Sequence, residues 1–156
     1  GQVHGQCGDT RTEEDFAAAV KHLIDTHPEK RVHHFVMDQL NTHKSEALVR
    51  YVAEYCGIEE DLGKKGKEGI LKSMQSREEF LSRKGKSIVF HYTPKHASWM
   101  NQIEIWFGIL GKKAIRRGNF TSKQDLKQKI FDFIEYFNKT MAKPFKWTYR
   151  GEVLCR

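Results

Sequence analysis

Two acidic residues stand in local contexts that suit metal-dependent phosphoryl chemistry. Asp38 directly follows the apolar run that ends in Met37, and Glu104 falls in the first turn of an amphipathic helical pattern. A strand end and a packed helix both hold a side chain rigidly, and carboxylate oxygens are the ligands that hard divalent cations prefer. Two such ions, held about 4 Å apart, activate an attacking oxygen and stabilise a leaving one. The pair therefore predicts a divalent-metal site for phosphodiester chemistry.

Both carboxylates also have an ordinary structural explanation. An Asp that ends a strand often forms a turn, because its side chain accepts a hydrogen bond from the backbone two residues on. A Glu in a first helical turn is favoured by the helix dipole alone. The residue types by themselves leave both explanations open, so the surrounding sequence has to decide between them.

The chain of 156 residues carries a formal net charge of +7, and the excess lies in one part of it. Residues 105–156 contain twelve Lys or Arg against four Asp or Glu, whereas residues 1–104 contain fifteen against sixteen. A basic surface is typical of proteins that contact nucleic-acid phosphates. Because cations at a helix end also interact well with its dipole, a purely structural role stays open. The candidate phosphate ligands are Lys112, Lys113, Arg116 and Arg117.

The order of the elements predicts an α/β protein in which helices cover a sheet, formed as one domain over residues 1–156. Thr12 with Asp15 predicts a helix start, and Thr121 with Gln124 predicts another. The remaining expected elements are a strand end over residues 1–7, strands over 31–37 and 87–92, a helix over 48–56 and a helix that carries Glu104.

Residues 57–86 differ from the rest of the chain in being rich in glycine and mixed charge, with few apolar residues. The pattern predicts an insertion within the domain, made of one or two short helices that lie on the surface. Ser76 with Glu79 has the spacing of a capping box, which predicts where one of these helices begins.

Two later segments have apolar stripes at helical spacing, and both stripes are expected to face a core. The stripe of the Glu104 helix consists of Ile103, Trp106, Phe107, Leu110 and Ala114. The stripe of the last helix consists of Leu126, Ile130, Phe133, Ile134 and Phe137.

No apolar run approaches the 18 or so residues that a membrane helix requires, and the first residues have neither a charged leader nor an apolar segment. The sequence therefore predicts a cytoplasmic protein with no membrane partner.

Two blocks of the sequence resemble the second and third catalytic blocks of bacterial insertion-sequence transposases of the DDE superfamily, in the mariner-like group. The first is FVMDQLNTHK, residues 35–44, and the second is YTPKHASWMNQIEIW, residues 92–106. The segment FNKTMAKPFKW, residues 137–147, is similar to the tail of that family. The resemblance extends over nearly the whole chain.

The resemblance implies a ribonuclease-H-like mixed sheet flanked by helices, with Asp38 as the second and Glu104 as the third metal-binding carboxylate. His43 and Asn101 match active-site neighbours of the family. The complete parent enzyme would use two Mg²⁺ or Mn²⁺ ions to cleave DNA at transposon ends and join it to target DNA. It would act as a homo-oligomer in the bacterial cytoplasm, associated with the nucleoid.

The sequence also departs from the family pattern. Gln39 replaces an Asn and Gln102 replaces a Pro, and the longer spacing between Asp38 and Glu104 is accounted for by the insertion over residues 57–86. No residue matches the block that carries the first catalytic Asp. The chain is therefore expected to be the C-terminal part of a catalytic domain that lacks its first strand or strands, and to be catalytically deficient.

Two other functions stay open. The chain could be a non-catalytic remnant that binds DNA or associates with itself, with carboxylates that hold no metal. It could also be a stand-alone nuclease in which Asp9, in a turn before the first helix, replaces the missing ligand.

Overall fold

A computed structural model describes residues 1–95, 97 and 101–144 of the chain. The chain divides into two compact units, one of Gly8–Ile109 and one that combines Gly1–Cys7 with Leu110–Arg156. Asp38 and Glu104 both belong to the first unit. Among the described residues, no helix has the length and apolar character needed to cross a membrane.

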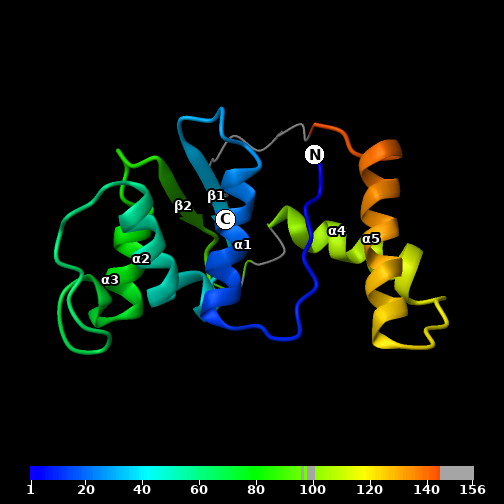
Figure 1. Cartoon of the computed structure of the whole chain (residues 1–156), viewed down its shortest axis with the longest axis horizontal. Helices are drawn as coiled ribbons and strands as arrows, with labels where there is room; N and C mark the ends of the chain where they lie inside the picture. The colour runs from blue at the N-terminus through cyan, green and yellow to red at the C-terminus, as the bar shows by residue number, and fades with distance from the viewer. Residues whose placement is uncertain (96, 98–100, 145–156) are drawn as a thin grey trace, which may run out of the picture. The chain divides into compact units, whose positions relative to one another are not determined.

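The first unit contains a small sheet and several helices (Figure 1). Strands β1 and β2 pair in parallel, from His33 opposite Ile88 to Met37 opposite Tyr92. This arrangement confirms the mixed α/β class, and the sheet has two strands in the described part of the chain. The elements are α1 (Glu13–Asp25), β1 (His33–Met37), η1 (Asn41–Lys44), α2 (Glu46–Tyr55), η2 (Ile70–Lys72), α3 (Met74–Ser82), β2 (Ile88–Tyr92) and most of α4 (Gln102–Leu110).

Local capping explains where the first helices begin. In α1, the Thr12 hydroxyl accepts the backbone N–H of Asp15, and the Asp15 carboxylate accepts the N–H of Thr12, so the predicted capping box is confirmed. In α2, the Ser45 hydroxyl accepts the N–H of Leu48. Each such cap contributes about 1 kcal/mol by satisfying a backbone donor that the helix leaves unpaired.

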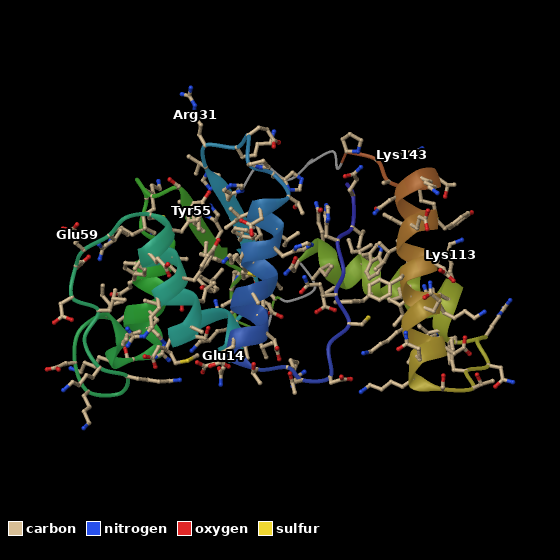
Figure 2. The ribbon with its side chains drawn as sticks, viewed as in Figure 1. Glu14, Arg31, Tyr55, Glu59, Lys113 and Lys143 are labelled. Atoms are coloured by element: carbon tan, nitrogen blue, oxygen red, sulfur yellow. The ribbon has the colours of Figure 1, made fainter. Side chains whose placement is uncertain are left out.

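The core of this unit joins α1, α2, α3 and the sheet. Apolar side chains from these elements pack into one buried cluster. Fully burying one Val, Leu, Ile or Phe side chain contributes about 1.5–3 kcal/mol to the free energy of unfolding, so the cluster stabilises the unit strongly. On the inner face of the sheet, the rings of Phe35 and Phe90 stack with centroids 5.1 Å apart. Polar side chains such as Arg31 and Glu59 extend outward at the periphery (Figure 2). The most buried core residues are Val20, Ile24, Leu48, Val49, Val52, Leu71, Phe80, Leu81, Ile88 and Phe90.

Most of residues 57–86 are exposed or half-buried, as expected of short surface helices, but their apolar anchors reach the core. Leu71, Phe80 and Leu81 are at most 1% exposed and belong to the core. The predicted capping box of Ser76 with Glu79 is wrong, because Ser73 caps α3 and shares a capping box with Ser76. Phe80 and Leu81 bury one side of α3, and Leu71 of η2 joins the same core. A few apolar residues are thus enough to attach the segment, even though its overall apolar content is low.

The second unit contains η4 (Gly111–Ile115), a π-helix, and α5 (Lys123–Thr140). Ser122, rather than Thr121, caps α5 by accepting the N–H of Asp125. Residues 1–7 do not form the expected strand. Instead, the side-chain amide of Asn138 binds both backbone groups of Val3, at 2.8 Å each.

The predicted apolar stripes are only partly covered. In α4, Trp106 and Leu110 are buried, whereas Ile103 is 40% and Phe107 52% exposed. Beyond Leu110 the hydrogen bonding changes to the π type, with the Arg116 N–H donating to the Gly111 carbonyl at 2.9 Å, so the α-helical spacing does not continue to Ala114. The stripe of α5 is half-buried throughout.

Candidate metal centre

Asp38 emerges at the carboxyl edge of the parallel sheet. It directly follows β1, and the backbone N–H of Thr93 donates to the Met37 carbonyl at 2.8 Å, one step beyond the last residue of β2. The two chain segments therefore leave the sheet side by side. Ligands of open α/β sheets bind at this edge, where loops diverge from rigid strands.

The two oxygens of Asp38 differ in what they contact. Oδ1 accepts the N–H of Leu40 at 3.1 Å and lies 2.7 Å from Nδ1 of His43. No hydrogen bond or ion pair joins Oδ2 to a described residue, and the side chain is 30% exposed. The Leu40 N–H therefore holds one oxygen, and the His43 imidazole lies beside that oxygen without a hydrogen bond of regular geometry.

His43 is fixed as well. Its ring packs against the ring of Phe16 from α1, with centroids 4.4 Å apart, and its side chain is 16% exposed. His43, which the family resemblance implies as an active-site neighbour, places a nitrogen base beside the carboxylate.

The loop that carries Asp38 and His43 is attached to the end of β2. The Tyr92 hydroxyl donates to the His43 carbonyl at 2.7 Å, and the Gln39 side-chain amide donates to the Thr93 carbonyl at 2.7 Å. Burial, reinforced by the negative charge of Glu78, raises the pKa of Tyr92, so this hydroxyl remains a donor well into the alkaline range.

Helix α3 supports the same loop from another side. The buried Lys44 ammonium donates to Glu78 at 2.5 Å and also to the side-chain carbonyl of Gln39. The Arg77 guanidinium, 7% exposed, donates to the carbonyls of Lys44 and Leu71 at 2.6 and 3.1 Å. A segment expected to be a surface insertion thus holds the Asp38 loop.

Sequence reasoning missed Lys44, Arg77 and Glu78. One signal was available for Arg77, which lies three residues after Met74 and three before Phe80, on the apolar side of α3. A charged residue on that side must find partners when it is buried. The partner of Glu78 lies 34 residues away in the chain, and no local pattern indicates it.

Glu104 lies in the first turn of α4 and is exposed. No described residue makes a hydrogen bond or ion pair with its carboxylate, so the structure does not join it to Asp38 by a direct contact. Asn101 accepts backbone N–H groups of α4, from Ile103 through its side chain and from Glu104 through its carbonyl. Asn101 therefore initiates the helix, and no hydrogen bond joins it to Asp38.

The described residues contain no cluster of three or more His, Cys, Asp or Glu side chains that could hold a metal ion. His96 and residues 98–100, within the second resembling block, lie outside the described part, as does the tail block after residue 144. The four predicted phosphate ligands, Lys112, Lys113, Arg116 and Arg117, are exposed on η4 and the turn after it, in the unit that does not contain Asp38.

A comparison with protein-family models finds a match between residues 2–127 and the DDE superfamily endonuclease family. No significant match is found among curated proteins or among solved structures.

Proposed function

Because the chain belongs to the DDE superfamily of endonucleases, we propose that it is the C-terminal part of the catalytic core of a mariner-like transposase with a ribonuclease-H-like fold. The parent enzyme cleaves DNA strands and transfers them with divalent metal. The observation that carries the proposal is Asp38, held at the carboxyl edge of a parallel sheet with one oxygen bound by the Leu40 N–H beside His43 and the other without a hydrogen bond or ion pair to a described residue.

The donor atoms fit a hard divalent cation. Asp38 and Glu104 offer carboxylate oxygens without a described partner, and Mg²⁺ or Mn²⁺ prefers such oxygens. Bound ions in the complete enzyme, two in number, would supply charge that activates water and stabilises the leaving oxygen. Asp38 and Glu104 would hold these ions, with His43 beside the Asp38 carboxylate and Asn101 at the start of the helix that presents Glu104.

The remaining parts have supporting roles in this proposal. Residues 57–86 are an insertion in a partial catalytic domain over residues 1–156, and α3 within it supports the Asp38 loop. Lys112, Lys113, Arg116 and Arg117 contact DNA phosphates. The protein works as a homo-oligomer in the bacterial cytoplasm, at the nucleoid, on transposon ends and target DNA.

A second function, a non-catalytic remnant that binds DNA or associates with itself, has one observation in its favour. Each strand of the described sheet pairs on one side only. Unpaired strand edges present free backbone donors and acceptors, which favour pairing between copies.

The metal dependence of DNA binding separates the two functions. Fluorescence anisotropy with a labelled duplex, in EDTA and in Mn²⁺, is expected to give about tenfold tighter binding with the ion, a gain of about 1.4 kcal/mol. Asp38→Asn and Glu104→Gln should each abolish the gain, because both keep the side-chain shape and remove the charge. Glu14→Gln, an exposed carboxylate on α1 (Figure 2), is the matched control. If the wild-type protein binds DNA in a salt-sensitive way with the same affinity in EDTA and in Mn²⁺, it is the non-catalytic remnant.

A further inference from the structure

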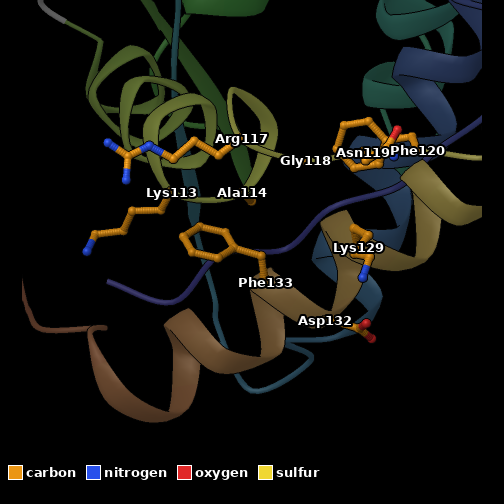
Figure 3. Close-up of a pocket in the computed structure, with 9 residues that line it drawn as sticks. All are labelled: Lys113, Ala114, Arg117, Gly118, Asn119, Phe120, Lys129, Asp132 and Phe133. Atoms are coloured by element: carbon orange, nitrogen blue, oxygen red, sulfur yellow. The ribbon is translucent and has the colours of Figure 1, made fainter.

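A hollow of about 490 Å³ lies in the second unit, outside the candidate metal centre. One wall comes from η4 and the loop that follows it, and the other comes from α5 (Figure 3). Its size falls in the range of small-molecule sites, and is too small to admit another protein domain. Its lining includes Lys113, Arg117, Phe120, Lys129, Asp132 and Phe133.

The charge of the hollow favours an anion. Three cations line it, and the side chains of Lys113, Arg117 and Lys129 form no ion pair with any described residue. The single carboxylate, Asp132, accepts a hydrogen bond from Gln128 at 2.8 Å. Positive charge therefore exceeds negative charge without being neutralised inside the protein, which attracts an anionic ligand.

The walls also contain aromatic rings, which a site for a simple anion does not require. Phe120 and Phe133 both line the hollow. The ring of Phe120 lies directly over Gly118, where an added Cβ would come within 2.2 Å of the ring atom Cζ. Any residue with a Cβ at position 118 would therefore displace the Phe120 ring from its position in the wall of the hollow.

A ligand that combines phosphate charge with a planar apolar face matches this composition. We propose that the hollow binds an unpaired nucleotide of a DNA strand, with its base against Phe120 and Phe133 and its phosphates near Lys113, Arg117 and Lys129. Stacking on aromatic rings together with basic side chains along the backbone is how proteins bind single-stranded nucleic acid. The inference rests on the proposed DNA-processing function and assigns the hollow a preference for single strands over duplex.

The test measures binding of a labelled oligothymidylate and of a duplex of the same length, both in EDTA. Phe120→Leu is expected to weaken single-strand binding about 5–100-fold, since stacking contributes about 1–3 kcal/mol per base. Duplex binding should change less than twofold. Phe131→Leu, an aromatic residue of α5 that is 38% exposed and outside the hollow, is the control and should change neither.

Two further variants keep the test decisive. Gly118→Ala retains both rings and displaces Phe120, so it should reproduce the selective loss. Lys129→Gln should weaken single-strand binding and lower its salt dependence, whereas Lys139→Gln, which removes a cation paired with Glu135 on the same helix, should not. Circular dichroism would verify that each variant is folded.

Unchanged single-strand binding in folded Phe120→Leu would overturn the proposal, as would an equal loss for duplex. Because EDTA removes divalent ions, these results do not depend on whether Asp38 and Glu104 bind metal. A result that overturns single-strand binding by the hollow can thus be told apart from a result that overturns the metal-dependent function.

Discussion

The carboxylate of Asp38 lies 2.7 Å from the imidazole of His43, between Oδ1 and Nδ1, five residues further along the same loop. The contact requires the loop to turn back on itself through η1 directly after β1. No hydrogen bond or ion pair joins the second carboxylate oxygen to a described residue, and the Asp38 side chain is 30% exposed. The Leu40 N–H thus holds the Asp38 carboxylate in place before any ion binds, so less ordering has to accompany binding.

We expect Glu78 to position this loop. Glu78→Gln removes the carboxylate that pairs with the buried Lys44 ammonium, and it should lower the free energy of unfolding by about 1–3 kcal/mol. It should also weaken Mn²⁺ binding, although Glu78 is not expected to touch the ion. Urea denaturation and calorimetry measure the two effects. Glu79→Gln changes the exposed neighbouring carboxylate and should leave both unchanged. Normal Mn²⁺ affinity in folded Glu78→Gln would show that the pair only stabilises the fold.

Arg77 is expected to be among the most sensitive positions of α3. Arg77→Met leaves the buried carbonyls of Lys44 and Leu71 without a charged donor and should cost about 2–4 kcal/mol of unfolding free energy. Arg50→Met removes an exposed pair with Glu46 and should cost less than about 0.5 kcal/mol. Equal midpoints for the two variants in urea would contradict the bridging role of Arg77.

Stability should fall at alkaline pH partly through Tyr92. The pKa of this hydroxyl is raised in the folded protein from its ordinary value of 10.0, so its contribution is complete below pH 10 and is lost as the pH rises above it. The slope is at most about 1.4 kcal/mol per pH unit. In urea titrations at pH 8 and pH 11, Tyr92→Phe should be less stable than the wild type at pH 8, and the difference should shrink at pH 11. Tyr136→Phe, at an exposed position, is the control.

Gly63 and Gly57 provide a matched pair in the segment before α3. Both have positive φ, at 75° and 62°. A Cβ at Gly63 would lie 2.2 Å from the Glu68 carbonyl oxygen, whereas a Cβ at Gly57 would have no neighbour within 4 Å. Gly63→Ala should therefore cost about 2–5 kcal/mol and Gly57→Ala about 1–2 kcal/mol. Thermal or urea unfolding that ranks them in the opposite order would refute the close approach at Gly63.

The sequence predicted those features that local chemistry determines. The cap formed by Thr12 and Asp15 depends on residues three apart, and the strand before Asp38 is apolar enough to be recognised. The partner of Lys44, by contrast, is brought close only by tertiary packing of α3. Residues 1–7 alternate as a strand does, yet Val3 is bound by the amide of Asn138, 135 residues away.

In the candidate metal centre too, relations within one loop were predictable from the sequence, whereas relations between distant segments were not. The family resemblance implied that His43 neighbours the Asp38 site, and both residues lie in one loop, so their proximity needs no long-range packing. The relation of Asp38 to Glu104 depends on how α4 packs, and the apolar stripe of α4 does not decide it, since two of its residues are exposed.

The central claim, that Asp38 and Glu104 together hold a divalent ion, is tested most directly by calorimetric titration of Mn²⁺ into the protein without DNA. We predict a weak isotherm for the wild type and for Glu14→Gln, and none for Asp38→Asn or Glu104→Gln. A wild-type protein that binds no Mn²⁺, or an isotherm that survives either of the last two substitutions, would contradict the account.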